Sequence, residues 1–271
     1  MTDINRLELK SKAKDFLRDN YWQCLAVCLA TNFVTQGFSM SIQLPVQLTS
    51  NNLSSVETHF NASYMPYFGL AYIGIMFGII VLALAFSIFL TAPLTVGLKR
   101  FFIKSITGEP KIPVILDVFK STNYLNVVKV TFMKNLFLTL WTMTGLIPYI
   151  IIVTVITIMY PSAIMRYAAA FIPFLAIIAM IPYLVKYYSY FTVEYILAEN
   201  LHISWRDAMN KGKEMMKGNT TSTFILQLSF IGWLLLGALA CGLGVIFVAP
   251  YIEATNTQLY LTLKNKYSFE I

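Results

Sequence analysis

The feature that most constrains this chain is an apolar stretch that runs from Phe224 to Leu263. As one straight helix, its 40 residues would be about 60 Å long at 1.5 Å per residue, twice the ~30 Å hydrocarbon thickness of a bilayer. The stretch must therefore turn back, and Cys241-Gly242-Leu243-Gly244 is the natural turn. Two membrane-crossing helices are expected, because unpaired backbone groups cost several kcal/mol in lipid.

Four further apolar runs of comparable length precede this hairpin. The predicted spans are residues 21–40, 67–94, 136–160, 168–185, 224–240 and 245–263. Only 12% of the residues are charged, against roughly 25% in soluble domains, which also favours a membrane protein. We therefore predict an all-α, polytopic bundle of six transmembrane helices, which forms a single integral membrane domain over residues 1–271.

The basic residues predict the orientation of these spans. If the N-terminus lies in the cytoplasm, so do residues 1–20, 95–135, 186–223 and 264–271, which hold 19 of the 20 Lys and Arg residues. Only Arg166 falls outside, so the positive-inside rule places both termini in the cytoplasm. An anionic inner leaflet then accounts for the net charge of +7, and no nucleic-acid partner is needed.

The one sizeable outer loop, residues 41–66, contains no Lys or Arg and is rich in Ser, Thr, Asn and Gln. It is the candidate for contact with something outside the cell. The alternative is a solvated connector between two spans.

An amphipathic helix is predicted in the third cytoplasmic segment, between an N-cap at Ser204 and a stop at Gly218. Its apolar face carries Trp205, Met209, Met215 and Met216, and its polar face includes Lys213 and Lys217. A basic amphipathic helix of this kind is typical of membrane surfaces. We expect it to lie on the inner leaflet through Trp205, Met209 and Met216.

A threefold pattern runs along the chain. Amphipathic segments near residues 9–18, 113–119 and 205–217 each precede a pair of spans, and the second span of each pair contains a proline. The candidate helix kinks are Pro93, Pro182 and Pro250, because a proline inside a helix removes one hydrogen bond. The pattern suggests three tandem repeats of a cytoplasmic amphipathic helix followed by a hairpin.

Several sequence blocks resemble a known family. They are Val96-Gly97-Leu98-Lys99-Arg100-Phe101-Phe102, Met216-Lys217-Gly218-Asn219, Leu226-Gln227-Leu228-Ser229-Phe230-Ile231-Gly232-Trp233 and Ala249-Pro250-Tyr251-Ile252-Glu253-Ala254-Thr255. They are similar to the bacterial, mainly Gram-positive, integral membrane family catalogued as domain of unknown function 975. The chain departs from the family pattern at Tyr149, Tyr183 and Glu253. The resemblance implies a polytopic protein of a bacterial membrane and supplies no reaction or substrate.

Motifs of catalysis are absent from the sequence. It contains no His-Glu-x-x-His, Gly-x-Ser-x-Gly or Walker loop, and the predicted topology puts His59 and His202 on opposite sides of the bilayer. Cytoplasmic carboxylates such as Glu194 and Glu199 are expected on solvated faces, and the aromatic residues of 187–191 are expected in an interfacial belt. We predict no catalytic residue, cofactor or metal site.

Glu253 is the exception, because it lies near the centre of the last predicted span. An ionised carboxylate there costs about 3 kcal/mol on insertion scales. The candidate intramembrane polar site consists of Glu253, Thr255, Asn256, Thr257 and Gln258. No Lys or Arg lies centrally in any predicted span, so we expect a mostly protonated Glu253 that faces the bundle interior. The alternatives are a proton- or cation-coupled site, a ligand contact, or a structural carboxyl group.

The leading functional hypothesis is a non-enzymatic, multi-pass protein of a bacterial cytoplasmic membrane. It would act as an interaction or envelope-stress module that contacts anionic lipid and an unidentified protein partner. The alternative hypothesis is a small-molecule or lipid transporter or binding bundle that uses the polar patch around Glu253.

Overall fold

The computed structural model describes residues 5–56, 65–108, 112–159, 164–239 and 243–267, and every regular element in these ranges is helical. For residues 36–56, 65–73, 157, 159, 164–171 and 243 the description covers the backbone alone. The first elements are α1 (Arg6–Val56), α2 (Met65–Phe86), the π-helical η2 (Ser87–Thr91), α3 (Ala92–Thr107), the 3-10 helical η3 (Ile112–Leu116), α4 (Asp117–Lys120) and α5 (Tyr124–Met159). The remaining elements are α6 (Ile164–Ala179), α7 (Ile181–Ser189), α8 (Val193–Glu199), α9 (Trp205–Met216), α10 (Thr220–Leu228), α11 (Ile231–Leu239) and α12 (Leu243–Tyr267).

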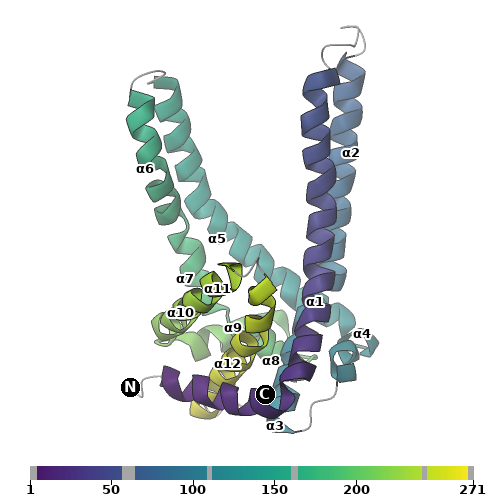
Figure 1. The fold of residues 1–271 in the computed structure, drawn as a ribbon, viewed down its shortest axis with the longest axis vertical. Coiled ribbons are helices and arrows are strands. Elements are labelled where there is room, and N and C mark those ends of the chain that lie inside the picture. The colour runs from purple at the N-terminus through teal and green to yellow at the C-terminus, as the bar shows by residue number, and fades with distance from the viewer. Residues whose placement is uncertain (1–4, 57–64, 109–111, 160–163, 240–242, 268–271) are drawn as a thin grey trace.

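Two long hairpins, α1–α2 and α5–α6, rise from a common base and diverge (Figure 1). The first part of α1 lies flat across the base, and the helix then turns upward beside α2 (Figure 1). A third hairpin, α11–α12, ends far below the tips of the other two (Figure 1). Its two helices approach closely, since a Cβ atom on Gly237 would lie 2.7 Å from the backbone nitrogen of Val245.

Four helical stretches in the described residues are long and apolar enough to cross a membrane. They are Gly74–Thr107, Tyr124–Ile156, Ile172–Glu199 and Thr220–Leu239. These stretches match the second to fifth predicted spans. The first predicted span lies in α1, where side chains are described only as far as residue 35, and the last lies in α12, which is not among the four. The all-α fold class is confirmed, and the count of six spans stays a prediction.

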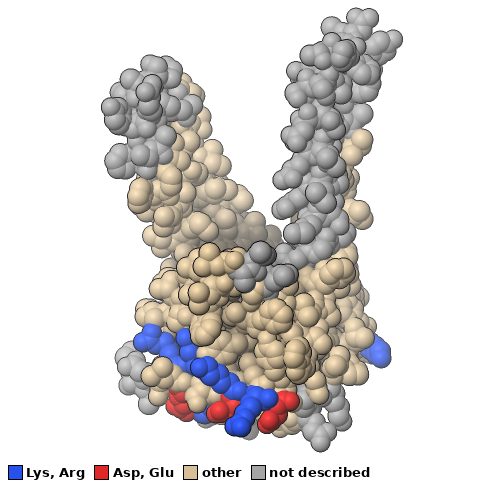
Figure 2. Space-filling view, viewed as in Figure 1, with Lys and Arg blue, Asp and Glu red and all other residues tan. Residues whose placement is uncertain are grey.

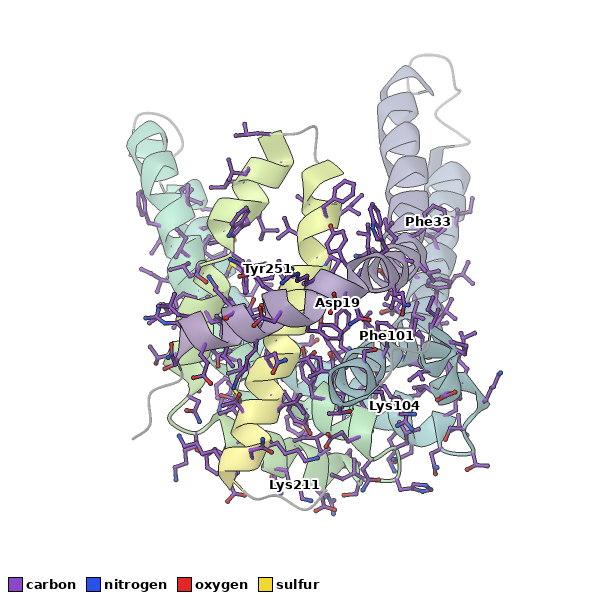
Figure 3. The ribbon with its side chains drawn as sticks, turned by 60° about the horizontal axis from the view of Figure 1, so that its bottom comes forward. Asp19, Phe33, Phe101, Lys104, Lys211 and Tyr251 are labelled. Carbon is purple, nitrogen blue, oxygen red and sulfur yellow. The ribbon has the colours of Figure 1, made fainter. Side chains whose placement is uncertain are left out.

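The base of the molecule holds the protein core. Figure 3 shows the first part of α1 crossing α12, and Leu9, Ala13 and Leu17 of this segment are buried. Phe101 and Phe102 of α3 are fully buried beneath it. The apolar face of the first amphipathic segment is therefore covered by protein rather than by lipid.

Charged side chains gather at the same base. In Figure 2 the visible Lys, Arg, Asp and Glu residues lie across the lower part of the molecule, opposite the tips of the two long hairpins. In this view the charged residues are therefore segregated to one end of the molecule.

The three proline positions differ in their effect on the helices. Pro93 is the second residue of α3, directly after the π-helical segment η2, and Pro182 is the second residue of α7, after an interruption at Met180. Pro250 lies inside α12, which continues through it. Helix irregularity therefore accompanies two of the three candidate kinks, and the threefold repeat stays a hypothesis.

Candidate functional site

Glu253 of α12 forms an ion pair with Lys99 of α3. The Lys99 Nζ and Glu253 Oε2 atoms are 2.5 Å apart, and the two side chains are 12% and 21% exposed. The expectation that no cation lies near Glu253 is therefore wrong. Lys99 belongs to the segment expected in the cytoplasm, but α2, η2 and α3 continue one another and bring it against α12.

A second ion pair lies close by. Lys134 of α5 donates through its Nζ atom to Oε1 of Glu194 in α8, and these side chains are 12% and 20% exposed. Glu194 was expected on a solvated face, and the structure buries it in a pair instead. Burial of a carboxylate without a cationic partner would be unfavourable, because an uncompensated buried charge costs several kcal/mol.

Both ion pairs face one cavity of about 330 Å³. The charged and amide residues on its wall are Lys99, Lys134, Glu194, Gln227, Glu253 and Asn256, and the aromatic residues are Tyr187, Tyr188, Tyr190, Phe191 and Tyr195. Residues expected in an interfacial aromatic belt thus line a cavity. Tyr195 is the most deeply buried of these rings, and the Lys99 Nζ atom lies 5.1 Å from its centre.

The predicted polar patch after Glu253 is only partly in this cavity. Asn256 lines it and accepts a hydrogen bond from Gln227 Nε2 at 2.6 Å. Thr255 and Thr257 are buried and donate to carbonyl oxygens of their own helix, on Tyr251 and Glu253. Gln258 is not on the cavity wall. Glu253 and Asn256 are therefore the two predicted residues that reach the site.

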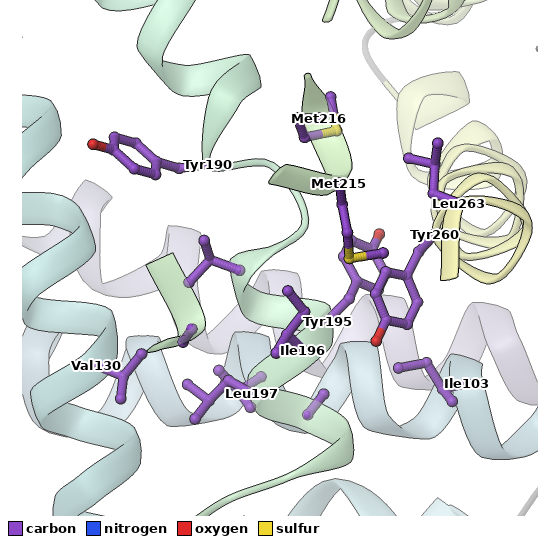
Figure 4. Packing of buried hydrophobic residues seen from close by; sticks show 14 of the residues in the cluster. Ile103, Val130, Tyr190, Tyr195, Ile196, Leu197, Met215, Met216, Tyr260 and Leu263 are labelled. Carbon is purple, nitrogen blue, oxygen red and sulfur yellow. The ribbon is translucent and has the colours of Figure 1, made fainter. Parts of the chain in front are cut away.

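A third group of charges, partly buried, lies at the base. Glu199 pairs with Lys264 at 2.6 Å and accepts a hydrogen bond from the Tyr260 hydroxyl at 2.9 Å. The ring of Tyr260 lies against that of Tyr195, with Met215 and Met216 nearby (Figure 4). Glu199 therefore also departs from the solvated position expected for it.

Helix α9 has the ends that the sequence predicted. The Ser204 hydroxyl oxygen accepts a hydrogen bond from the Asp207 backbone N–H at 3.2 Å, and Gly218 has a φ of 78°. The apolar face is placed differently. Met209, Met215 and Met216 are in the protein core, and Trp205 packs against Phe137, so these side chains meet protein where lipid was expected.

The polar face of α9 remains accessible, since Lys213 and Lys217 are exposed. Among the residues that the structure describes, no group of three His, Cys, Asp or Glu side chains could hold a metal ion. The cavity presents paired charges and aromatic rings.

Lys99, Lys134 and Glu194 are site residues that were not predicted from the sequence. The available signal was their position at the ends of apolar runs, where a charge is close to the hydrocarbon and needs a partner. Their convergence could not be predicted, because they come from three elements that are separated along the chain.

Fold and site together define an all-helical protein with four candidate membrane spans and a charged cavity within its helical base. Residues 1–267 match the family described as "Protein of unknown function (DUF975)". The chain belongs to this family, as its sequence blocks indicated. Comparison with curated proteins and with solved structures gave no match.

Proposed function

We propose that this protein is a multi-pass protein of the bacterial cytoplasmic membrane that binds a charged ligand in the cavity between α3, α5, α8 and α12, without catalysing a reaction. The main observation behind the proposal is that two ion pairs, Lys99–Glu253 and Lys134–Glu194, lie on the wall of one cavity. Because these charges lie on the wall of a cavity, they support the ligand-binding hypothesis more than the interaction-module hypothesis.

Stability alone does not account for these charges. Replacement of a buried ion pair by apolar residues is often neutral or stabilising, so such a pair is weak evidence for a structural role. Ionisable groups within membrane helices are instead typical of ligand or ion sites.

The proposed topology has six spans, with both termini and the base in the cytoplasm. The gathering of charged side chains at the base supports it, because positive charge is retained on the cytoplasmic side (Figure 2). The cavity then lies near the inner boundary of the hydrocarbon core, where both membrane-derived and cytoplasmic ligands can reach it.

Gentle extraction tests the ligand-binding proposal. The full chain is extracted with its surrounding lipid by a styrene–maleic acid copolymer, and the molecules retained after extensive washing are identified by mass spectrometry. The test variant is Lys134→Met/Glu194→Leu, which removes both charges of one cavity pair. The matched control is Lys264→Met/Glu199→Gln, which removes a pair at the base outside the cavity.

We expect a stoichiometric ligand in the wild type and the control and its loss in the test variant. The test variant should stay folded, because both charges leave together. A folded test variant that retains every molecule found in the wild type would overturn the proposal.

The interaction-module hypothesis, including a role in envelope stress, stays a second candidate. The observation that favours it is the exposed basic face of α9, which carries Lys213 and Lys217, together with Lys12, Lys14 and Arg18 of α1. Capture of one specific protein partner that fails in Lys213→Glu/Lys217→Glu but survives in Lys134→Met/Glu194→Leu would favour this function.

A further inference from the structure

A second pocket lies between α5 and the pair α6–α7, on the side of the hairpin tips. Its volume is about 280 Å³, and its wall consists of Thr142, Leu146, Tyr149, Ala176, Ala179, Met180 and Tyr183. Gly145 lets the helices approach here, because a Cβ atom at this position would overlap the carbonyl oxygen of Ala179. The wall is almost entirely apolar, in contrast to that of the charged cavity.

One face of α5 continues from the charged cavity into this apolar pocket. Lys134 and Leu138 line the cavity, and Thr142, Leu146 and Tyr149 line the pocket on the following turns. Spacings of four, four, four and three residues keep these side chains on a single helix face. The length from Leu138 to Tyr149 is about 16 Å at 1.5 Å per residue, close to half of a ~30 Å hydrocarbon core.

The opposite wall is also shared. Tyr183 lines the apolar pocket and Tyr187 lines the charged cavity, and their ring centroids are 5.8 Å apart. The polar and apolar spaces are therefore adjacent on both sides. A ligand that fills them would have a charged end at the base and an apolar chain of about half a bilayer in length.

The charges of the cavity restrict that ligand further. Two lysines and two glutamates balance each other, so a ligand with one anionic and one cationic group can exchange partners with them one for one. A purely anionic ligand would pair with Lys99 and Lys134 and leave both glutamates unpaired in a low-dielectric site, at a cost of several kcal/mol. The aromatic residues of the wall favour a bound ammonium group, because ring faces attract cations.

We propose that the ligand is a zwitterionic phospholipid whose phosphate binds Lys99 and Lys134, whose ammonium group binds Glu194 and Glu253, and whose acyl chain fills the apolar pocket. This inference rests on the proposed ligand-binding function and names the class of ligand. The same charge pattern fits a water-soluble zwitterion, and the apolar pocket distinguishes the two sources.

Three probes test the proposal on the full chain in mild detergent. They are dioctanoyl phosphatidylethanolamine, dioctanoyl phosphatidylglycerol and the chain-free glycerophosphoethanolamine, each titrated by microscale thermophoresis. The apolar pocket is filled by Ala176→Phe, with Ile178→Phe as the matched control, because Ile178 is 60% exposed two residues away on the same helix. The charged cavity is altered by Lys134→Met/Glu194→Leu.

The wild type should bind the phosphatidylethanolamine at least about tenfold more tightly than either other probe, because the chain-free probe lacks acyl chains for the apolar pocket and the phosphatidylglycerol lacks an ammonium group for the two glutamates. Ala176→Phe should remove most of that advantage and leave the chain-free probe unaffected, whereas Ile178→Phe should change neither. Lys134→Met/Glu194→Leu should weaken the binding of both zwitterionic probes, the phosphatidylethanolamine and the glycerophosphoethanolamine.

Each contrary result overturns a definite part of the proposal. Tighter binding of the phosphatidylglycerol would exclude a zwitterionic site. Equal binding of the lipid and the chain-free probe, insensitive to Ala176→Phe, would exclude a lipid while leaving the charged cavity as a ligand site. Absence of saturable binding by all three probes, with no retained molecule after gentle extraction, would overturn the lipid assignment and the proposed function together.

Discussion

The rings of Tyr195 and Tyr260 stack with their centroids 5.1 Å apart, and the stack connects two groups of buried charge. The Lys99 Nζ atom lies 5.1 Å from the centre of the Tyr195 ring, whereas the Tyr260 hydroxyl donates to Glu199. Both rings are fully buried. The stack therefore joins α8 to α12 between the cavity and the base.

Tyr260→Phe should lower the free energy of unfolding by about 1–2 kcal/mol, because it removes a hydrogen bond to a charged acceptor and retains the stacked ring. The measurement is the fraction of monodisperse protein left after heating in detergent. Tyr260→Leu is the control, and it should cost more because it also removes the stack. No loss in Tyr260→Phe would show that the hydroxyl contributes nothing, and equal losses in the two variants would show that the stacked ring adds nothing beyond the hydrogen bond.

Glu253→Gln should destabilise the protein by about 3 kcal/mol, because it leaves the Lys99 ammonium without its carboxylate. Lys99→Met/Glu253→Gln should recover most of that loss, since no unpaired charge remains. The same heating assay on wild type, both single variants and the double variant gives the coupling between the two sites. Additive effects would contradict the ion pair and restore the protonated Glu253 that the sequence suggested.

Single cysteines at Ser50 and Ser162, in a background without Cys24, Cys28 and Cys241, should react with a membrane-impermeant maleimide in intact cells. This follows from the positive-inside topology, which places both positions outside. Labelling is quantified by a gel shift.

Cysteines at Thr122 and Asn210 are the cytoplasmic controls and should react only after permeabilisation. Both are exposed, whereas Ser105 in the same cytoplasmic region is buried and would stay unlabelled on either side. Labelling of Asn210→Cys in intact cells would reject the topology.

Lys213→Glu/Lys217→Glu should fold normally and weaken the attachment of the base to anionic lipid by about 1 kcal/mol for each charge removed. Cosedimentation of the detergent-free protein in nanodiscs with anionic vesicles measures this, and high salt should abolish the difference because exposed charges are screened. Met215→Asp is the contrasting variant. It should reduce folded protein sharply, because it places a charge where the methionine is fully buried.

Local sequence signals predicted much of this fold. The cap at Ser204 and the stop at Gly218 were correct, because each depends on the conformation of a few adjacent residues. Of the predicted turn of the last hairpin, Leu243 and Gly244 begin α12, whereas Cys241 and Gly242 lie outside the described residues. The length of an apolar run and the position of a glycine are both visible within one segment of the sequence, so features that depend on them can be predicted.

Such local signals do not show which part of the protein a side chain packs against. The apolar stripe of α9 predicts burial equally well against lipid and against protein, so Met209 and Met215 could not be assigned to the core. The absence of a nearby basic residue in the sequence likewise suggested a neutral Glu253, but its partner comes from a different helix. Periodicity defines a face of a helix, and only the tertiary packing defines what covers it.

The long separation of Lys99 and Glu253 has a consequence for biosynthesis. The two residues are 154 positions apart, and at 5–20 residues per second the ribosome needs about 8 to 30 s between them. Throughout that interval Lys99 has no Glu253 to pair with, and its ammonium group must be hydrated or paired in another way. The wall of the cavity is therefore complete only after α12 has been made, and a chain that ends before α12 would keep Lys99 but lack Glu253 and Asn256.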